Sequence, residues 1–336
     1  MTDLLLTYIV PVYNTAPYVV KCLQSLVNQG LEPDQYEIIA VDDGSTDDSR
    51  ARIEAFAQEH PQVRLLCQAN AGVSAARNLA LDHARGRYVQ FIDSDDYLAD
   101  GAMAQLVRRA VDENLDVLMF NFDWVDVDGQ ALKVSKPRDD MQSTPVMTGV
   151  EFLDAFTLMQ YVCWYIVRLD CLNKREIRFN TSLIACEDGE MSPRFMLYAS
   201  RVAYCDASPY CYVNRGDSAM NNTNMGHLRR RIFSQIDAAQ SIDRTINQFE
   251  AATGREVPAS VAGLRNLYLY FSMTKALTCG CVDDAVSRIR SAGLYPFPCI
   301  GPETNYMGAK WKVIHRLMMH PGLWSVLSRV YSMMNK

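Results

Sequence analysis

The hydrophobic pattern of the first hundred residues alternates between short apolar runs and amphipathic stretches. Four apolar runs are typical of strands buried on both faces. These runs are residues 4–12, Tyr36–Val41, Val63–Cys67 and Tyr88–Ile92. Apolar residues at helical spacing lie between them and predict helices at Pro17–Gln29, Asp48–His60 and Val73–Ala84. Strands that alternate with helices over short connections predict an α/β fold, with a mixed, mainly parallel sheet flanked by helices.

The rest of the chain adds further strands and then a long helical region. A helix at Gly101–Glu113 precedes an apolar strand at Val117–Phe122 and a hairpin turn at Asp128-Gly129. From about residue 226 onward, the spacing of apolar residues is helical over 226–250, 258–279 and 282–291. We therefore expect an α/β domain over residues 1–222 and a helical region over residues 223–336.

Composition narrows the class of protein. The 336 residues carry a net charge of −6, which does not favour binding to nucleic acid. The ten cysteines are scattered without zinc-ligand spacing, which is typical of reduced thiols in a cytosolic protein. Asp3 stands where a signal peptide would carry a basic residue, and no apolar window reaches the length of a membrane span. We expect a cytoplasmic protein that is at most peripheral to a membrane.

The last stretch, residues 304–336, contains basic side chains and no acidic ones. Lys310, Lys312 and Arg316 alternate with apolar and aromatic residues. This pattern suits a helix that lies on an anionic membrane surface, and it equally suits a terminal pair of helices packed on the core. Both interpretations remain open from the sequence.

Polar residues follow each of the first four predicted strands. They are Tyr13-Asn14, Asp42-Asp43, Asn70 with Arg77, and Asp93-Ser94-Asp95. Open α/β sheets bind ligands at the carboxyl ends of their strands, so these residues mark a candidate binding edge. Two carboxylates spaced i, i+2, such as Asp93 and Asp95, can bind one hard divalent cation; alternatively they form a solvated acidic turn before the next helix.

Four segments in order closely resemble the inverting family 2 glycosyltransferases, which have a GT-A fold. The segments are IVPVYNTAPYVVKCLQSLVNQ (9–29), EIIAVDDGSTDDS (37–49), NAGVSAARNLAL (70–81) and GRYVQFIDSDDYL (86–98). Weaker matches occur at Trp164-Tyr165, in ACEDGEMSPRFM (185–196) and in YCYVNRGDSAM (210–220). The resemblance covers roughly residues 4–220.

The resemblance implies a role for each matching residue. Pro11, Val12 and Tyr13 would line the uracil and ribose site, and Asp42 or Asp43 would bind the base. Asn14, Asn70 and Ser94 accompany them as substrate-binding candidates. Asp93 and Asp95 would hold Mg²⁺ or Mn²⁺ at the diphosphate, with Asp93 also near the ribose. Arg77 would face the nucleotide, and Arg215 would reach the diphosphate or be solvated. On the acceptor side, Asp188 would be the general base, Glu187 would hold the helix start or touch the acceptor, and Trp164 would stack on the acceptor.

The expected function is therefore metal-dependent transfer of a sugar, with inversion, from a UDP-sugar to a hydroxyl of a glycan or lipid-linked saccharide. Bacterial relatives of this layout build polysaccharides such as capsule and lipopolysaccharide. Two other classes compete. A catalytically inactive carbohydrate-binding relative would have lost part of the acidic motifs, which this chain retains. A phosphoacceptor signalling domain would need a Lys at the end of a later strand, where this chain has Asn121 and Asp123.

Overall fold

The computed structural model describes residues 4–136, 141–158, 160–215 and 224–295, together with residues 320, 324 and 326. The chain forms two compact units. The first comprises Met1–Thr181 and Arg194–Gly216, and the second comprises Ser182–Pro193 and Asp217–Lys336. The boundary that we expected at residue 222 stays a prediction.

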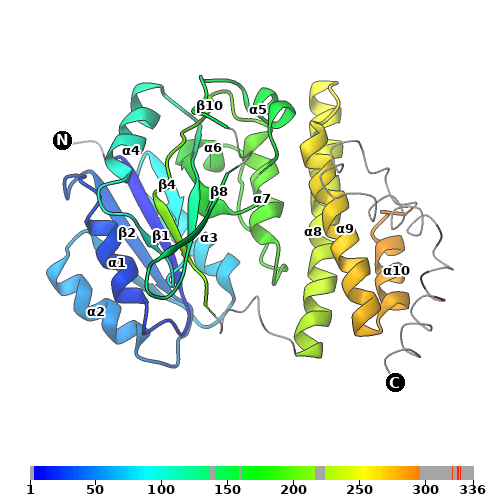
Figure 1. The fold of residues 1–336 in the computed structure, drawn as a ribbon, viewed down its shortest axis with the longest axis horizontal. Coiled ribbons are helices and arrows are strands. Elements are labelled where there is room, and N and C mark those ends of the chain that lie inside the picture. The colour runs from blue at the N-terminus through cyan, green and yellow to red at the C-terminus, as the bar shows by residue number, and fades with distance from the viewer. Residues whose placement is uncertain are drawn as a thin grey trace. The chain divides into compact units, whose positions relative to one another are not determined.

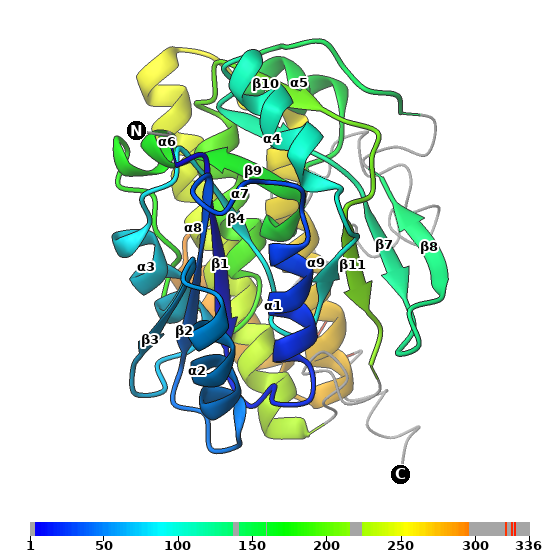
Figure 2. The same ribbon diagram turned by 90° about the vertical axis from the view of Figure 1, so that its left-hand side faces the viewer.

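A seven-stranded sheet forms the centre of the first unit (Figure 2). Its strands are β1 (Leu6–Val12), β2 (Tyr36–Asp42), β3 (Val63–Cys67), β4 (Tyr88–Phe91), β6 (Val117–Met119), β9 (Tyr165–Arg168) and β10 (Val202–Tyr204). They lie in the order β10-β6-β9-β4-β1-β2-β3. Only β9 pairs antiparallel with its neighbours within this sheet. The expected mixed, mainly parallel sheet is thus confirmed.

Helices connect and cover these strands. They are α1 (Val19–Val27), α2 (Ser49–Glu59), α3 (Val73–His83), α4 (Met103–Asp112), α5 (Gly149–Ala155) and α6 (Leu169–Asn173). Helices α1 and α2 contact each other, whereas α3 packs against β1 and β2. The chain passes from β1 through β2 to β3 and then returns to β4, so right-handed crossovers place α3 on the face opposite α1 and α2. Because β1 and β2 are buried along their whole length, their carboxyl ends are fixed positions for the loops that follow.

A second, four-stranded sheet in the same unit consists of β5 (Tyr97–Leu98), β7 (Phe122–Val125), β8 (Ala131–Ser135) and β11 (Tyr210–Val213). The expected hairpin at Asp128-Gly129 joins β7 to β8. The expectation of one strand over Val117–Phe122 is wrong, because that run divides between the two sheets. At the break, the backbone N–H of buried Asn121 donates to the Ala207 carbonyl at 2.8 Å, and its side chain bonds Asp206 and Tyr204.

The second unit contains the long helices α8 (Met225–Thr253) and α9 (Ala259–Cys279) and the shorter α10 (Val282–Ser291), as the sequence pattern predicted (Figure 1). Helix α8 packs along α9, and α10 contacts both. A glycine in the left-handed conformation ends α8 at Gly254 and α9 at Gly280. Among the described residues, no helix is long and apolar enough to cross a membrane.

Helix α7 (Glu187–Met196) contributes its first seven residues to the second unit and the remainder to the first. Of the basic tail over residues 304–336, the structure describes only His320, Trp324 and Val326. The membrane-bound and core-packed interpretations of that tail therefore both stay predictions, because the stretch lies almost entirely outside the described residues.

Candidate active site at the carboxyl ends of the strands

The loop after β1 is held against the loop after β2. Pro11 and Val12 are buried in β1, whereas the side chain of Tyr13 is 49% exposed. Asn14 adopts the left-handed conformation, with φ of 53°, which Asn tolerates better than most residues. Its Oδ1 accepts a hydrogen bond from Thr46 N at 2.8 Å, and its own N–H donates to Ser45 Oγ at 3.1 Å. Tyr13 is thereby presented on a fixed turn at the sheet edge.

Asp43 binds the loop that leads into α3. Its buried carboxylate accepts hydrogen bonds from Gln68 Nε2 at 2.7 Å, Ala71 N at 2.8 Å and Gly72 N at 2.9 Å. Asp42, also buried, accepts one from Ser45 N at 3.2 Å. Both carboxylates therefore hold neighbouring loops in place, and the contacts do not decide whether Asp42 or Asp43 binds the uracil base.

Gly44 permits this close approach of two loops. Its φ is 73°, and a Cβ atom at this position would lie 2.8 Å from the backbone N of Asn70. Real Cβ atoms essentially never approach backbone so closely, and few residues other than glycine adopt this φ. The exposed Asn70 therefore lies directly beside the turn that follows Asp42 and Asp43.

Arg77 on α3 is buried and forms an ion pair with Asp93. The Arg77 Nη2 atom lies 2.9 Å from Asp93 Oδ1, and the guanidinium carbon lies 5.1 Å from the centre of the Phe179 ring. Arg77 is therefore not a solvated residue on the helix surface. Asn78 makes two hydrogen bonds to the backbone of Phe179, which holds that ring beside Arg77.

Asp95 pairs with Arg215, which lies just after β11. The Arg215 Nη2 atom donates to Asp95 Oδ2, and the guanidinium lies 4.5 Å from the ring centre of Tyr18. The Arg215 side chain is only 13% exposed, so its solvated interpretation is wrong. Burial and the negative charge of Asp93 raise the pKa of Asp95, although Arg215 opposes this shift.

Asp96 links the turn that contains Asp93, Asp95 and Asp96, called here the acidic turn, to β11. Its buried carboxylate accepts hydrogen bonds from Tyr210 Oη at 2.6 Å and Val213 N at 2.8 Å. The Asp93 N–H donates to the same Tyr210 hydroxyl at 3.2 Å. Burial, together with its neighbouring carboxylates, raises the pKa of Asp96 well above its ordinary value. Three carboxylates thus lie in one turn, and two of them have one arginine each.

This turn fits a divalent cation. Asp93 and Asp95 supply hard oxygen ligands; burial, and after it the negative charge of Asp93, raises the pKa of Asp95, and a bound cation would favour the ionised carboxylate. Among the described residues there is no group of three or more His, Cys, Asp or Glu side chains with metal-binding geometry. The two carboxylates would therefore provide part of the coordination, and oxygen atoms of a ligand and of water would complete it.

Ser94, between the two carboxylates, is also tied to the loop after β1. Its hydroxyl oxygen accepts a hydrogen bond from Thr15 Oγ1 at 3.0 Å. The structure therefore brings the candidate residues of the first unit together at the carboxyl ends of four strands, and Arg215 joins them from the end of β11. These candidates are Pro11, Val12, Tyr13, Asn14, Asp42, Asp43, Asn70, Arg77, Asp93, Ser94 and Asp95.

Trp164 belongs to an aromatic cluster in the first unit. Its ring centre lies 4.4 Å from that of Phe122 and 5.6 Å from that of Tyr161. Trp164 itself is buried, at 2% exposure, whereas Tyr161 is 45% exposed. Tyr161 was not among the residues expected from the sequence, although it lies three positions before Trp164. Stacking of an acceptor on Trp164 stays a proposal, and Tyr161 is the more accessible ring.

Glu187 and Asp188 belong to the second unit, where they form the first turn of α7. Both are partly buried. The Asp188 carbonyl oxygen accepts a hydrogen bond from Ser192 Oγ at 2.8 Å, within the helix. Acidic residues in a first helical turn also complement the positive end of the helix dipole.

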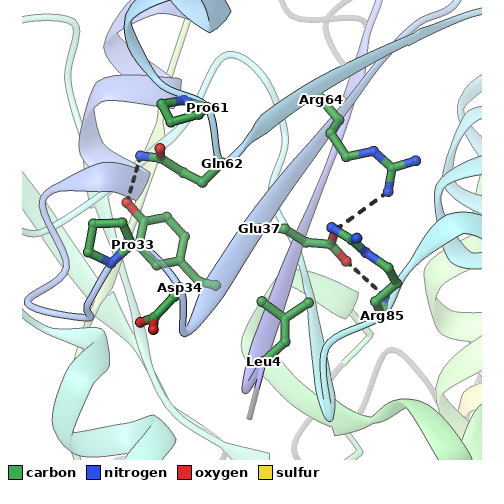
Figure 3. Close-up of a pocket in the computed structure, with 9 residues that line it drawn as sticks. Leu4, Pro33, Asp34, Glu37, Pro61, Gln62, Arg64 and Arg85 are labelled. Atoms are coloured by element: carbon green, nitrogen blue, oxygen red, sulfur yellow. Dashed lines mark hydrogen bonds and ion pairs between the residues drawn. The ribbon is translucent and has the colours of Figure 1, made fainter. Parts of the chain in front are cut away.

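A pocket of about 520 Å³ lies at the opposite edge of the main sheet, where β2 and β3 begin (Figure 3). It is lined by Leu4, Pro33, Asp34, Tyr36, Glu37, Pro61, Gln62, Arg64 and Arg85. Burial alone would raise the pKa of Glu37, but hydrogen bonds from Arg85 and Thr7 outweigh burial and lower it. None of the candidate residues expected from the sequence lines this pocket, so it is separate from the site around Asp93 and Asp95.

Comparison with known families matches residues 7–169 to the family described as glycosyl transferase family 2. Two curated relatives illustrate the likeness. The Escherichia coli (strain K12) protein named uncharacterized glycosyltransferase YibD is 34% identical over 230 residues, which are 67% of this chain and 64% of the relative. A poly(ribitol-phosphate) beta-glucosyltransferase of Bacillus spizizenii is 26% identical over 275 residues, 81% of this chain and 41% of the relative. The match thus spans less than two thirds of these relatives' own length.

Two solved structures share the fold. Staphylococcus aureus TarS 1-349 in complex with UDP-GlcNAc has a TM-score of 0.58 at 19% identity, covering 86% of this chain and 89% of the other. The mannosyltransferase PcManGT of Pyrobaculum calidifontis, in complex with GDP-Man and Mn²⁺, has a TM-score of 0.55 at 18% identity, covering 100% and 88%. At these identities the likeness shows the fold alone.

Proposed function

This chain belongs to glycosyl transferase family 2, and from that premise we propose that it transfers a sugar from a UDP-sugar to a hydroxyl group of a saccharide or lipid-linked saccharide, with inversion at the anomeric carbon. The observation that carries the proposal is the convergence of Asp93, Asp95, Arg77 and Arg215 at one edge of the sheet. A nucleoside diphosphate leaves with growing negative charge, which cationic groups at that edge would stabilise.

The acidic turn is the proposed diphosphate site. A Mg²⁺ or Mn²⁺ ion bound by Asp93 and Asp95 would act there as a Lewis acid toward the departing phosphate. Arg77 and Arg215 already lie beside these carboxylates and donate charge-assisted hydrogen bonds to them. Their guanidinium groups carry further N–H donors suited to phosphate oxygens. The solved relative with Mn²⁺ and GDP-Man supports a metal role by analogy of fold.

The turns after β1 and β2 form the proposed nucleoside site. Tyr13 is exposed on the turn that Asn14 fixes, so its ring can pack on the base and ribose above Pro11 and Val12. Asp42 or Asp43 would accept a hydrogen bond from the uracil N–H, which a carboxylate strengthens by its charge. The solved relative with UDP-GlcNAc supports a uridine nucleotide.

Asp188 is the proposed general base, with Glu187 supporting the helix start or the acceptor. A base need only be ionised and within hydrogen-bond reach of the attacking hydroxyl, which an Asp in a first helical turn can satisfy. Tyr161, which is exposed, is the proposed acceptor platform, and buried Trp164 would support its ring from the core side. One base and one displacement would invert the anomeric centre.

The proposed acceptor belongs to bacterial polysaccharide synthesis, of which capsule and lipopolysaccharide are examples. The named activity of the Bacillus spizizenii relative, which glucosylates poly(ribitol phosphate), supports a cell-envelope polymer as the acceptor class. We also propose that the protein works in the cytoplasm at the inner face of the membrane, where residues 304–336 either contact the lipid surface or pack on the core.

The experiment that tests the function is a donor screen. The full chain is incubated with UDP-glucose, UDP-galactose, UDP-N-acetylglucosamine and UDP-glucuronate in Mn²⁺, and released UDP is measured by chromatography. The proposal requires release from at least one donor and an inverted anomeric centre in the sugar product by NMR. Retention of configuration would contradict the mechanism.

A further inference from the structure

The chain on both sides of Glu187 and Asp188 is tied to α8 within the second unit, through backbone atoms before the pair and through the Glu190 side chain after it. Ser234 Oγ on α8 accepts hydrogen bonds from the N–H groups of Ile184 and Ala185, both at 3.1 Å, and donates to the Ala185 carbonyl at 2.9 Å. Ser241 Oγ, two turns along α8, donates to Glu190 Oε1 at 2.6 Å. The chain is therefore held before and after the acidic pair.

Tyr268 on α9 contacts the acidic pair's own turn. Its side chain is buried, and its hydroxyl makes a hydrogen bond with the thiol of Cys186. Cys186 has a φ of 67°, a left-handed conformation that non-glycine residues rarely adopt and that needs support from surrounding contacts. The residue before the acidic pair is thus held in a costly conformation next to Tyr268.

Gly189, directly after Asp188, packs against the same phenol ring. A Cβ atom at this position would overlap the Tyr268 hydroxyl oxygen, and it would lie 3.0 Å from the ring carbon Cζ that bears the hydroxyl. The absence of a side chain at Gly189 therefore allows Tyr268 to reach the backbone of the turn. Burial, with the charges of Asp188 and Glu187, raises the pKa of Tyr268 well above its ordinary value, so the hydroxyl keeps its proton as a donor.

We propose that Tyr268 is a positioning residue for Asp188. It packs on Gly189 after Asp188 and bonds Cys186 before the pair, so it fixes the backbone from which the Asp188 side chain projects. The inference deepens the proposed function and rests on Asp188 being the general base. Helices α8 and α9 would then hold the proposed base in one geometry, through Ser234 and Ser241 on α8 and Tyr268 on α9.

The test uses the steric relation between Gly189 and Tyr268. Gly189→Ala introduces a methyl group that collides with the hydroxyl, so the turn and the Tyr268 ring must move apart. Tyr268→Phe removes the hydroxyl, so in the double variant the methyl meets only Cζ at 3.0 Å, which a small adjustment relieves. Tyr270→Phe, the same change two residues along α9, is the matched control. Each variant is measured in the full chain for UDP release from the fastest donor of the screen, for UDP affinity and for melting temperature.

We expect Gly189→Ala to lower kcat by about 10²-fold, since a displacement of about 1 Å can cost that much. Tyr268→Phe should lower kcat by about tenfold. The double variant should be several-fold more active than Gly189→Ala, while the UDP dissociation constant of all three stays within about twofold of the wild type. Tyr270→Phe should match the wild type. A merely structural contact would lower melting temperature without this split between kcat and UDP affinity.

Asp188→Asn is measured in the same assays, and it separates the proposal that Asp188 is the general base from the proposal that Tyr268 positions it. An active wild type with an equally active Asp188→Asn protein would overturn the assigned base, and the positioning role with it. An inactive Asp188→Asn protein with a Gly189→Ala protein of wild-type kcat would overturn the positioning role alone. So would a double variant no more active than Gly189→Ala.

Discussion

Replacing Asp43 by Asn should release the loop that carries the chain into α3. The Asp43 carboxylate accepts three N–H groups, from Gln68, Ala71 and Gly72, at 2.7 to 2.9 Å. Asn has nearly the same shape but only one acceptor oxygen, and its amide nitrogen donates instead. In any orientation at least one N–H of the loop then faces another donor.

The magnitude follows from these three bonds. Keeping the amide oxygen on Gln68 and Ala71 sacrifices the bond to Gly72, and a hydrogen bond to a charged group contributes about 1.5–3 kcal/mol. The two retained bonds become neutral, which roughly halves their strength. Because such contributions are not additive, we expect a loss of about 3 kcal/mol in the local opening free energy.

Hydrogen exchange reports this loss where it occurs. A loss of about 3 kcal/mol corresponds to roughly 10²-fold faster exchange of the Ala71 and Gly72 amides. Asp48→Asn is the control, because Asp48 is exposed and its side chain makes no capping hydrogen bond. UDP affinity should fall as well, since α3 carries Arg77. Exchange within about threefold of the wild type at these amides would refute the reasoning.

Three further predictions follow from other contacts. Arg215→Met should weaken UDP binding by about tenfold or more in calorimetry, because it removes the guanidinium group that pairs with Asp95 and would contact the diphosphate. Unchanged affinity would exclude Arg215 from the diphosphate site. Glu37→Gln should lower the free energy of unfolding by about 1–3 kcal/mol at pH 7 in urea titrations. Because the Glu37 pKa is lowered in the folded state, this penalty is present above its unfolded value and should shrink as the pH falls through the folded one; a constant penalty would argue against it. Asp188→Asn should lower kcat by about 10²-fold or more with UDP affinity within a few-fold, and Glu187→Gln should be milder; equal effects would undo the assignment.

The hydrophobic pattern predicted the strands and helices of the first hundred residues well, because each of these elements is formed by a continuous run of residues. An apolar run such as Tyr36–Val41 fits a buried strand, and it forms β2 almost to the residue. Since parallel strands end at one edge, Asp43 and Asp93 could be expected at a common site before any contact was known. The sequence left open whether Arg215 is solvated, and its ion pair with Asp95 decides this; Arg77 pairs with Asp93 of the same turn.

Contacts distant in sequence could not be predicted in this way. Where Val117–Phe122 divides between two sheets, Asn121 bonds Asp206, 85 residues away. The buried ring of Trp164 packs against Phe122 of the second sheet, far earlier in the chain. Tyr268 lies 79 positions after Gly189 on a helix without a recognisable motif, so only the folded chain shows their contact.

Calorimetric titration of the full chain with UDP, in Mn²⁺ and in excess EDTA, tests the central claim most directly. If Asp93 and Asp95 hold a cation at the diphosphate, UDP should bind at least about tenfold more tightly in Mn²⁺. Asp95→Ala should abolish that gain and leave the weak binding in EDTA nearly unchanged. Equal UDP affinity with and without the metal, or a metal-dependent gain that survives in Asp95→Ala, would contradict the account.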